Sequence, residues 1–157
     1  MRVQELRQHR LLTLAAISTS VVAIDLLTKA WASRNLVGRT VEIIPVLLSF
    51  TFTENTGAAF SFFQNAGVFL SLAALVALVV IGVSVWSPRP IGEVVGLALI
   101  AGGALGNLTD RLTRGDGLFD GPVIDWIQFP NFPVFNLADT SITFGVAALL
   151  WVSWRRR

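Results

Sequence analysis

The chain has 157 residues, of which 54% are hydrophobic and only 14% charged, and its mean hydropathy is +0.67. This composition indicates a small integral membrane protein with one domain over residues 1–157. The absence of cysteine excludes disulfides, thiol catalysis and thiolate metal sites. The formal net charge is only +2, and no basic stretch is long enough for nucleic acid, so we expect no nucleic-acid partner.

Four apolar stretches are long enough to cross a bilayer, which takes about 20 mostly apolar residues. We predict membrane-spanning helices at about residues 11–32, 66–86, 93–110 and 137–154. Tryptophans near the expected helix ends are typical of interfacial anchors. They are Trp31, Trp86, Trp151 and Trp154. The fold class is therefore an all-α membrane protein with four transmembrane helices.

Basic residues at both ends of the chain predict its orientation in the membrane. Seven of them fall on one side, namely Arg2, Arg7, Arg10, Arg89 and Arg155–Arg157, against five on the other, namely Lys29, Arg34, Arg39, Arg111 and Arg114. With an even number of spans, this places both termini in the cytoplasm. A cleavable signal peptide would also fit the basic and apolar start, but Asp25 and Lys29 interrupt the cleavage region.

This topology brings the polar residues in and near the helices to the outer side of the membrane. Asp25 and Lys29 share one helix face, as do Asn107, Asp110 and Arg111. Asn136 and Asp139 lie at the same level, at the start of the last helix. The loop before that helix supplies Asp125, and the segment before the second helix supplies Glu54 and Asn55. Charged groups prefer helix ends, so chance clustering explains any single residue better than it explains the set. Because acids at a membrane boundary are costly to desolvate, the whole set indicates function.

Two local patterns add detail. Residues 48–53 alternate apolar and polar side chains, which predicts a strand resting on the membrane surface. The small residues of Asn55–Phe60 follow, and they suit either a close backbone approach to a ligand or a simple re-entry turn. In the third helix, Gly102 and Gly106 favour close helix packing.

The chemistry available to this chain is that of carboxylates. Two acids held close share a proton, so one can activate water while the other polarises a carbonyl. The residues alone leave the pair open among Asp25, Asp110, Asp116, Asp120, Asp125 and Asp139. Asp116 and Asp120 are the weakest candidates, because the glycine-rich stretch around them predicts a mobile, exposed loop. A zinc site is not expected, because the single His9 cannot supply several nitrogen ligands.

Two other classes remain open at this point. A proton-coupled carrier would use intramembrane acids as a relay, but it needs polar residues across the bilayer, and the inner halves of these helices have none. A magnesium-dependent lipid phosphotransferase would also use clustered acids, although no phosphate motif of that kind is visible. Sensitivity of the activity to a chelator would distinguish it.

Five sequence blocks carry a resemblance to a known family. In chain order they are Asp25–Lys29 (DLLTK), Asn55–Phe60 (NTGAAF), Gly102–Arg111 (GGALGNLTDR), Val123–Asp125 (VID) and Phe135–Asp139 (FNLAD). Together they resemble bacterial lipoprotein signal peptidase, or signal peptidase II, from the first helix to the fourth. Any one block is weak evidence, whereas five in the family's order are highly specific.

The resemblance implies a membrane aspartic endopeptidase without a cofactor, with its active site on the extracytoplasmic side and a surface β-cradle at residues 41–53. Its catalytic aspartates would be Asp125 and Asp139. The supporting positions would be Asp25, Lys29, Asn55, Gly106, Asn107, Asp110, Arg111 and Asn136. The implied substrates are prolipoproteins cut just before a diacylglyceryl-modified cysteine, the implied surroundings are membrane lipids, and we expect a monomer.

The sequence departs from the family pattern at two places. Trp126 stands where the family more often has Phe, an aromatic exchange that we expect to matter little. The stretch between Arg111 and Val123 is longer than is common, which leaves the conformation of this outer loop open without affecting the predicted dyad.

Overall fold

The computed structural model describes residues 2–57 and 67–156. Its elements are α1 (Arg2–Asn35), β1 (Val41–Ile44), β2 (Leu48–Asn55), α2 (Gly67–Ser84), α3 (Ile91–Thr113), β3 (Val123–Gln128) and α4 (Leu137–Trp154). All four of these helices are long and apolar enough to cross a membrane. The chain is a mainly helical, multi-pass membrane protein with a small sheet, as the sequence predicts.

Two helices extend beyond their predicted bounds where polar residues continue the helix past its apolar stretch, whereas α2 ends at Ser84 rather than at residue 86. Helix α1 begins at Arg2 rather than near residue 11, because no glycine or proline interrupts the polar first turns. Helix α3 continues past Asp110 to Thr113, since Asp110 and Arg111 are buried inside the fold. Helix α4 has the predicted bounds. The predicted start of the second helix, at residue 66, lies outside the described residues.

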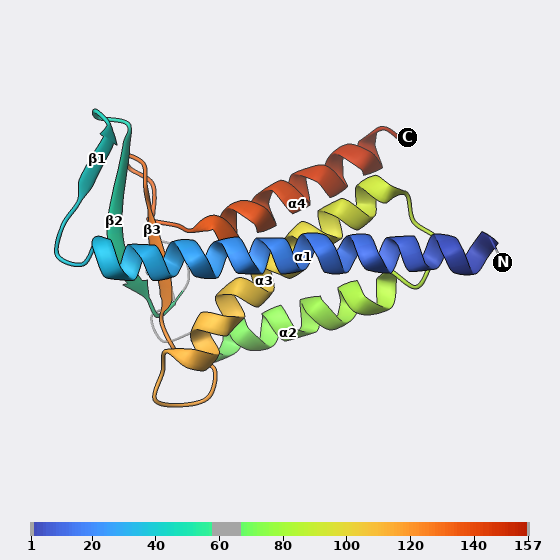
Figure 1. Ribbon diagram of the computed structural model, residues 1–157, viewed down its shortest axis with the longest axis horizontal. Coiled ribbons are helices and arrows are strands. Elements are labelled where there is room, and N and C mark those ends of the chain that lie inside the picture. The colour runs from blue at the N-terminus through green and yellow to red at the C-terminus, as the bar shows by residue number, and fades with distance from the viewer. Residues whose placement is uncertain (1, 58–66, 157) are drawn as a thin grey trace.

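The helices lie side by side, with the sheet at one end of the bundle and both chain termini at the other (Figure 1). Helix α3 is central and packs against α1, α2 and α4, whereas α2 packs mainly against α3. The packing is so close that a Cβ atom at Gly102 would lie 2.7 Å from the Cβ of Val21. One turn on, a Cβ at Gly106 would lie 2.5 Å from Oδ2 of Asp25. The predicted role of these two glycines in helix packing is therefore confirmed.

The three strands form one antiparallel sheet in the order β1-β2-β3. Strand β2 confirms the predicted strand, and its Phe50 and Phe52 pack on a buried cluster that includes Ala32, Ile124 and Trp126. Strand β3 is a correction, because the sequence analysis placed Asp125 in a loop. Its short run VIDWIQ shows no alternation of apolar and polar residues, since its first four residues are all buried.

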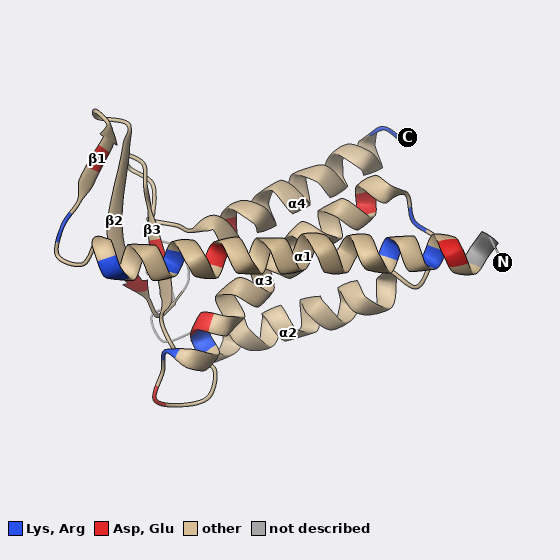
Figure 2. Cartoon of the chain, in the orientation of Figure 1, with Lys and Arg blue, Asp and Glu red and all other residues tan. Residues whose placement is uncertain are grey.

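Charged side chains gather toward the two ends of the bundle (Figure 2). The sheet end holds both acids and bases, whereas the end with the termini is mainly basic. The long central segments of the helices are almost free of charge.

Candidate active site

Asp125 is held in the middle of β3 with its carboxylate buried and both oxygens hydrogen-bonded. Its side chain is only 2% exposed. The Asn55 amide donates to Oδ2 at 2.9 Å, and the Asn136 amide donates to Oδ1 at 2.6 Å. Strand pairing brings Asn55 here, because Thr53 lies opposite Asp125 and Asn55 opposite Val123 in the β2–β3 register. Sheet register and a helix cap therefore together fix this acid.

Asp139 lies in the first turn of α4, and an asparagine cap fixes its backbone. The side-chain oxygen of Asn136 accepts the backbone N–H of Asp139 at 2.9 Å, which is the usual bond of a helix N-cap. The Asn107 amide of α3 donates to Oδ1 of Asp139 at 2.8 Å. Because the amide group of Asn136 also binds Asp125, one side chain ties the positions of the two acids together.

Burial, together with the nearby negative charge of Asp139, raises the pKa of Asp125 to about 7. The hydrogen bonds from Asn55 and Asn136 and the positive charge of Lys29 act in the opposite direction. Since desolvation outweighs these stabilising contacts, Asp125 keeps its proton at pH values where an ordinary aspartate is ionised.

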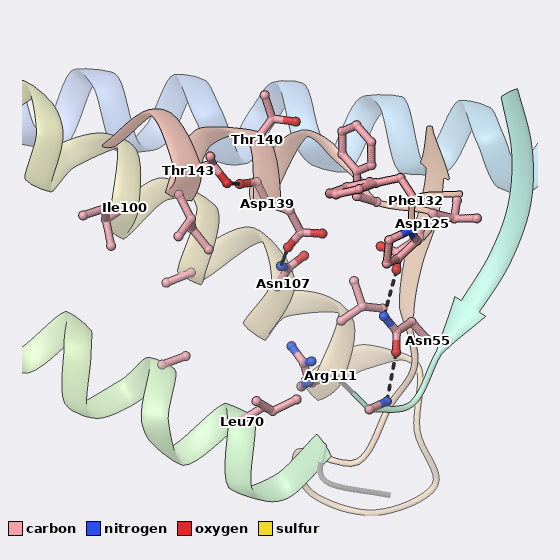
Figure 3. A pocket seen from close by; sticks show the side chains of 18 of the residues that line it. Asn55, Leu70, Ile100, Asn107, Arg111, Asp125, Phe132, Asp139, Thr140 and Thr143 are labelled. Atoms are coloured by element: carbon pink, nitrogen blue, oxygen red, sulfur yellow. Dashed lines mark hydrogen bonds between the residues drawn. The ribbon is translucent and has the colours of Figure 1, made fainter. Parts of the chain in front are cut away.

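Both carboxylates line a cleft of about 1030 Å³. Its polar end holds Asn55, Asn107, Arg111, Asp125 and Asp139, and these side chains converge in Figure 3. Its other end is apolar and lies between α2 and α4, with α3 behind it. That end is lined by Leu70, Ala73, Ala74, Ala77, Ile100, Ala104, Ile142 and Phe144. Three phenylalanines from the segment before α4 also line the cleft, namely Phe129, Phe132 and Phe135. The cleft therefore joins a pair of acids to a surface suited to hydrocarbon.

Arg111 is the cationic side chain of this cleft. It is buried, and its Nε atom has no hydrogen-bond partner among the described residues. A buried guanidinium nitrogen needs an acceptor, because desolvation without one is costly. Arg111 is thus free to bind an oxygen of a molecule in the cleft.

A second polar group, which we call the ion cluster, lies behind the acids and consists of Asp25, Lys29, Asp110 and Arg114. The Lys29 ammonium lies 2.7 Å from Oδ2 of Asp25 and 2.9 Å from Oδ2 of Asp110. Arg114 pairs with Oδ1 of Asp110 at 2.6 Å. Lys29 also donates to Oδ1 of Asn107 at 2.8 Å, so the ion cluster contacts the amide that binds Asp139.

The ion cluster also ties separate elements together through the backbone. Oδ1 of Asp25 accepts the N–H of Ala138 in α4 at 3.0 Å, and Oδ2 of Asp110 accepts the N–H of Ile124 in β3 at 3.2 Å. These contacts fix the segments that precede Asp139 and Asp125. Asp25 and Asp110 therefore support the positions of the other two acids.

The structure brings the predicted polar positions together at one end of the bundle, but only some of them line the cleft. Asp116 and Asp120 lie in an exposed segment and do not line the cleft, and Glu54 is exposed on β2. Residues 58–60 of the predicted turn lie outside the described residues. Sequence analysis did not single out Arg114, although its spacing of four from Asp110 on a helix is a usual signal of an ion pair. Over residues 2–57 and 67–156, no group of three or more His, Cys, Asp or Glu side chains could hold a metal ion.

The model of the family described as Signal peptidase (SPase) II matches residues 17–155. The chain belongs to the signal peptidase II family. It is therefore an enzyme, a membrane peptidase. The curated relatives agree with this assignment. A lipoprotein signal peptidase of Thermosynechococcus vestitus is 39% identical over 144 residues, covering 87% of each chain. One of Synechocystis is 41% identical over 145 residues, covering 88% of this chain and 85% of the relative.

Solved structures support the same family fold. A bacterial membrane enzyme determined by the in meso method at 2.3 Å superposes with a TM-score of 0.81 and 28% identity, covering 91% of this chain and 88% of the other. A second one, determined at 1.9 Å, gives a TM-score of 0.77 and 30% identity, covering 89% and 91%. The signal peptidase II fold thus accounts for most of the chain.

Proposed function

We propose that this protein is an aspartic endopeptidase that removes the signal peptide from prolipoproteins, cutting just before a diacylglyceryl-modified cysteine. The observation that carries the proposal is the pairing of Asp125 and Asp139 in one cleft, where amide donors hold each acid and neither forms an ion pair with another described residue. Two carboxylates that share a proton are the arrangement that activates water for peptide hydrolysis.

In the proposed mechanism, one water molecule lies between the two carboxylates. Asp125 starts protonated, because its pKa is raised to about 7, and it donates that proton to the scissile carbonyl oxygen. Asp139, as a carboxylate, takes a proton from the water while the water oxygen attacks the carbonyl carbon. The tetrahedral species then breaks at the C–N bond, and Asp139 returns its proton to the leaving amine. As the carbonyl re-forms, one hydroxyl of the tetrahedral species gives its proton to Asp125, which restores the starting state of both acids.

The lining of the cleft supports this kind of substrate. Arg111 offers a donor with no partner among the described residues, which suits a peptide carbonyl near the scissile bond. The apolar end between α2 and α4 suits the hydrocarbon of a lipidated substrate, and Leu70 and Ile100 lie on that side in Figure 3. The amides of Asn55, Asn107 and Asn136 would hold the dyad, and the ion cluster would hold the elements that carry it.

The proposal places the protein in the cell membrane with both termini in the cytoplasm and the dyad on the extracytoplasmic side. Both termini lie at the end of the bundle away from the dyad, and basic residues outnumber acidic ones at that end (Figure 2). We further propose a single domain that acts as a monomer, because the dyad and the side chains that hold it all belong to one chain.

The test is a gel-shift assay of a diacylglyceryl-modified prolipoprotein in membranes. We expect the wild type to convert it to the mature form, and Asp125→Asn and Asp139→Asn each to lower the rate by about 10³-fold, within the range of general acid–base catalysis. Asp116→Asn is the matched control, since it makes the same change on an exposed loop outside the cleft. EDTA should have no effect. Retained processing in both dyad variants would rule out the mechanism, and an uncut substrate with wild type would rule out the function.

A further inference from the structure

A second concave site lies at the end of the bundle that carries the termini. It is a cleft of about 500 Å³, lined by Leu6, His9 and Arg10 of α1, by Pro88–Ile91 at the α2–α3 connection, and by Arg156 after α4. Three parts of the chain that are distant in sequence therefore meet around one hollow. Figures 1 and 2 show this end, with basic residues on α1, on the connection and at the C-terminus.

The charges around this basic cleft do not balance. Arg10, Arg89 and Arg156 bring three guanidinium groups to it. Arg89 lies 2.9 Å from Oε2 of Glu93, and Arg156 lies 2.7 Å from Oε1 of the same residue. One carboxylate is thus shared by two arginines, which leaves an excess of positive charge at the cleft.

Arg10 is the side chain that lacks an acceptor. It makes no hydrogen bond or ion pair with any residue in the described part of the chain, and its Nε atom is buried from solvent. A guanidinium presents donors in a rigid fork that matches the oxygens of a phosphate. Without such an acceptor, a buried donor keeps its full desolvation cost.

The rim of the cleft is apolar, which favours a lipid over a free anion as the ligand of this cleft. Leu6 and Ile91 are exposed beside the arginines, and Pro88 and Pro90 form the wall between them. Acyl chains could follow the exposed apolar surface of the helices while the headgroup enters the cleft. Basic residues at the end of a helix bundle also lie at the depth of lipid headgroups, where they are attracted to anionic lipid.

We propose that this cleft binds the phosphate of an anionic membrane phospholipid, with Arg10 as its main ligand and Arg156 as a second one. The site is distinct from the cleft that holds Asp125 and Asp139, and it lies at the opposite end of the bundle. Occupancy by lipid would neutralise the half-buried Arg10 and hold α1, the α2–α3 connection and the C-terminus together.

The probe is phosphatidylglycerol, compared with phosphatidylcholine of the same acyl chains, and the measurement is native mass spectrometry of the purified full chain. We expect wild type to retain phosphatidylglycerol over phosphatidylcholine and Arg10→Gln to reduce that retention about fivefold, as for one arginine near an anionic surface. Arg155→Gln is the matched control, because it removes the same charge at the same end but outside the cleft. It should retain the lipid as wild type does.

Three results would overturn the proposal. They are equal retention of the two lipids by wild type, equal losses in Arg10→Gln and Arg155→Gln, and displacement of phosphatidylglycerol by millimolar inorganic phosphate, which would show a site for the free anion. Circular dichroism checks that each variant folds. If Arg10→Gln fails to fold, Arg156→Gln takes its place, because this cleft residue lies after the last helix.

Discussion

The two groups of carboxylates at the sheet end of the bundle differ in the groups that contact them. In the ion cluster, each acid lies within 2.9 Å of a cation, since Lys29 contacts both Asp25 and Asp110, and Arg114 contacts Asp110 as well. In the dyad, Asp125 and Asp139 receive hydrogen bonds from asparagine amides instead. The cations hold the acids of the ion cluster in short ion pairs, whereas neutral amides hold the acids of the dyad.

The two groups also differ in access. Asp125 and Asp139 line the large cleft, whereas Asp25, Lys29 and Asp110 do not. Asn107 is the link between them, because its oxygen accepts from Lys29 and its amide nitrogen donates to Asp139. The ammonium of Lys29 therefore fixes which way the Asn107 amide points. From this difference we expect the ion cluster to stabilise the fold, and the dyad to perform the chemistry proposed above.

The largest effect should be the loss of cleavage rate on substitution of an acid of the dyad, with the fold retained. Asp125→Asn should lose cleavage by about 10³-fold while keeping its fold. Because the folded pKa of Asp125, about 7, lies above its ordinary value of 3.8, its contribution to stability is fully present below pH 3.8 and is lost as pH rises through about 7.

The neutral asparagine cannot ionise, so the Asp125→Asn variant should lack that loss. Its free energy of unfolding should exceed that of wild type at pH 8 and come close to it at low pH. Chemical unfolding in detergent, followed by circular dichroism at several pH values, measures this difference. A variant that is less stable than wild type at pH 8 would contradict the assignment of Asp125 as a proton-bearing acid.

In the ion cluster, Lys29→Ala should lower the free energy of unfolding. Removing one partner of a buried ion pair costs about 3–5 kcal/mol, because the acids left behind are buried without compensation. The matched control is Arg34→Ala on the same helix, where an exposed basic residue should matter by less than about 0.5 kcal/mol. Equal effects of the two substitutions on the unfolding free energy would show that the ion cluster does not hold the fold together.

The sequence predicted the elements that depend on local pattern and missed those that depend on pairing. The apolar stretches predicted the four helices, because a span must be apolar along its whole length. Residues 48–53 predicted β2 through their alternation, but β3 has four buried residues in a row and is defined by its register with β2. Topology alone brought the polar residues to one end of the bundle.

The division of those polar residues into two groups could not be predicted from spacing. Asp25 and Asp110 both pair with Lys29 because α1 and α3 approach closely at Gly106. That approach depends on three-dimensional packing. The choice of Asp125 and Asp139 as catalytic residues came from family resemblance. It stays a prediction until the variants are assayed.

A smaller loss of stability should follow from Gly106→Ala. The added Cβ would lie 2.5 Å from Oδ2 of Asp25, the oxygen that contacts Lys29, so the helices or the ion pair must shift. Overpacking of this kind costs about 1–3 kcal/mol. Gly82→Ala is the matched control on α2, since a Cβ there meets nothing within 4 Å, and it should be neutral or slightly stabilising. Thermal unfolding of the two variants tests the difference, and equal stabilities would contradict it.

The smallest and most specific effect should be a shift in pH dependence on removing Asn55. Its hydrogen bond lowers the pKa of Asp125, so Asn55→Ala should raise that pKa above about 7, by roughly half a unit to one unit for one hydrogen bond. If Asp125 donates the proton, kcat/KM falls as pH rises through this pKa, and the alkaline limb of the profile moves to higher pH in the variant. Thr53→Ala is the matched control, because Thr53 is exposed on β2 opposite Asp125 and should leave the profile unchanged.

The direction of the limb decides between the two possible roles of Asp125. As the base, it would have to be ionised, so the rate would rise with pH through about 7, and the substitution would move this rising limb instead. A falling limb that moves upward in Asn55→Ala assigns Asp125 as the acid and Asp139 as the base. A rising limb would exchange the roles of the two aspartates while leaving the dyad itself in place, so the measurement tests the proton positions separately from the identity of the catalytic pair.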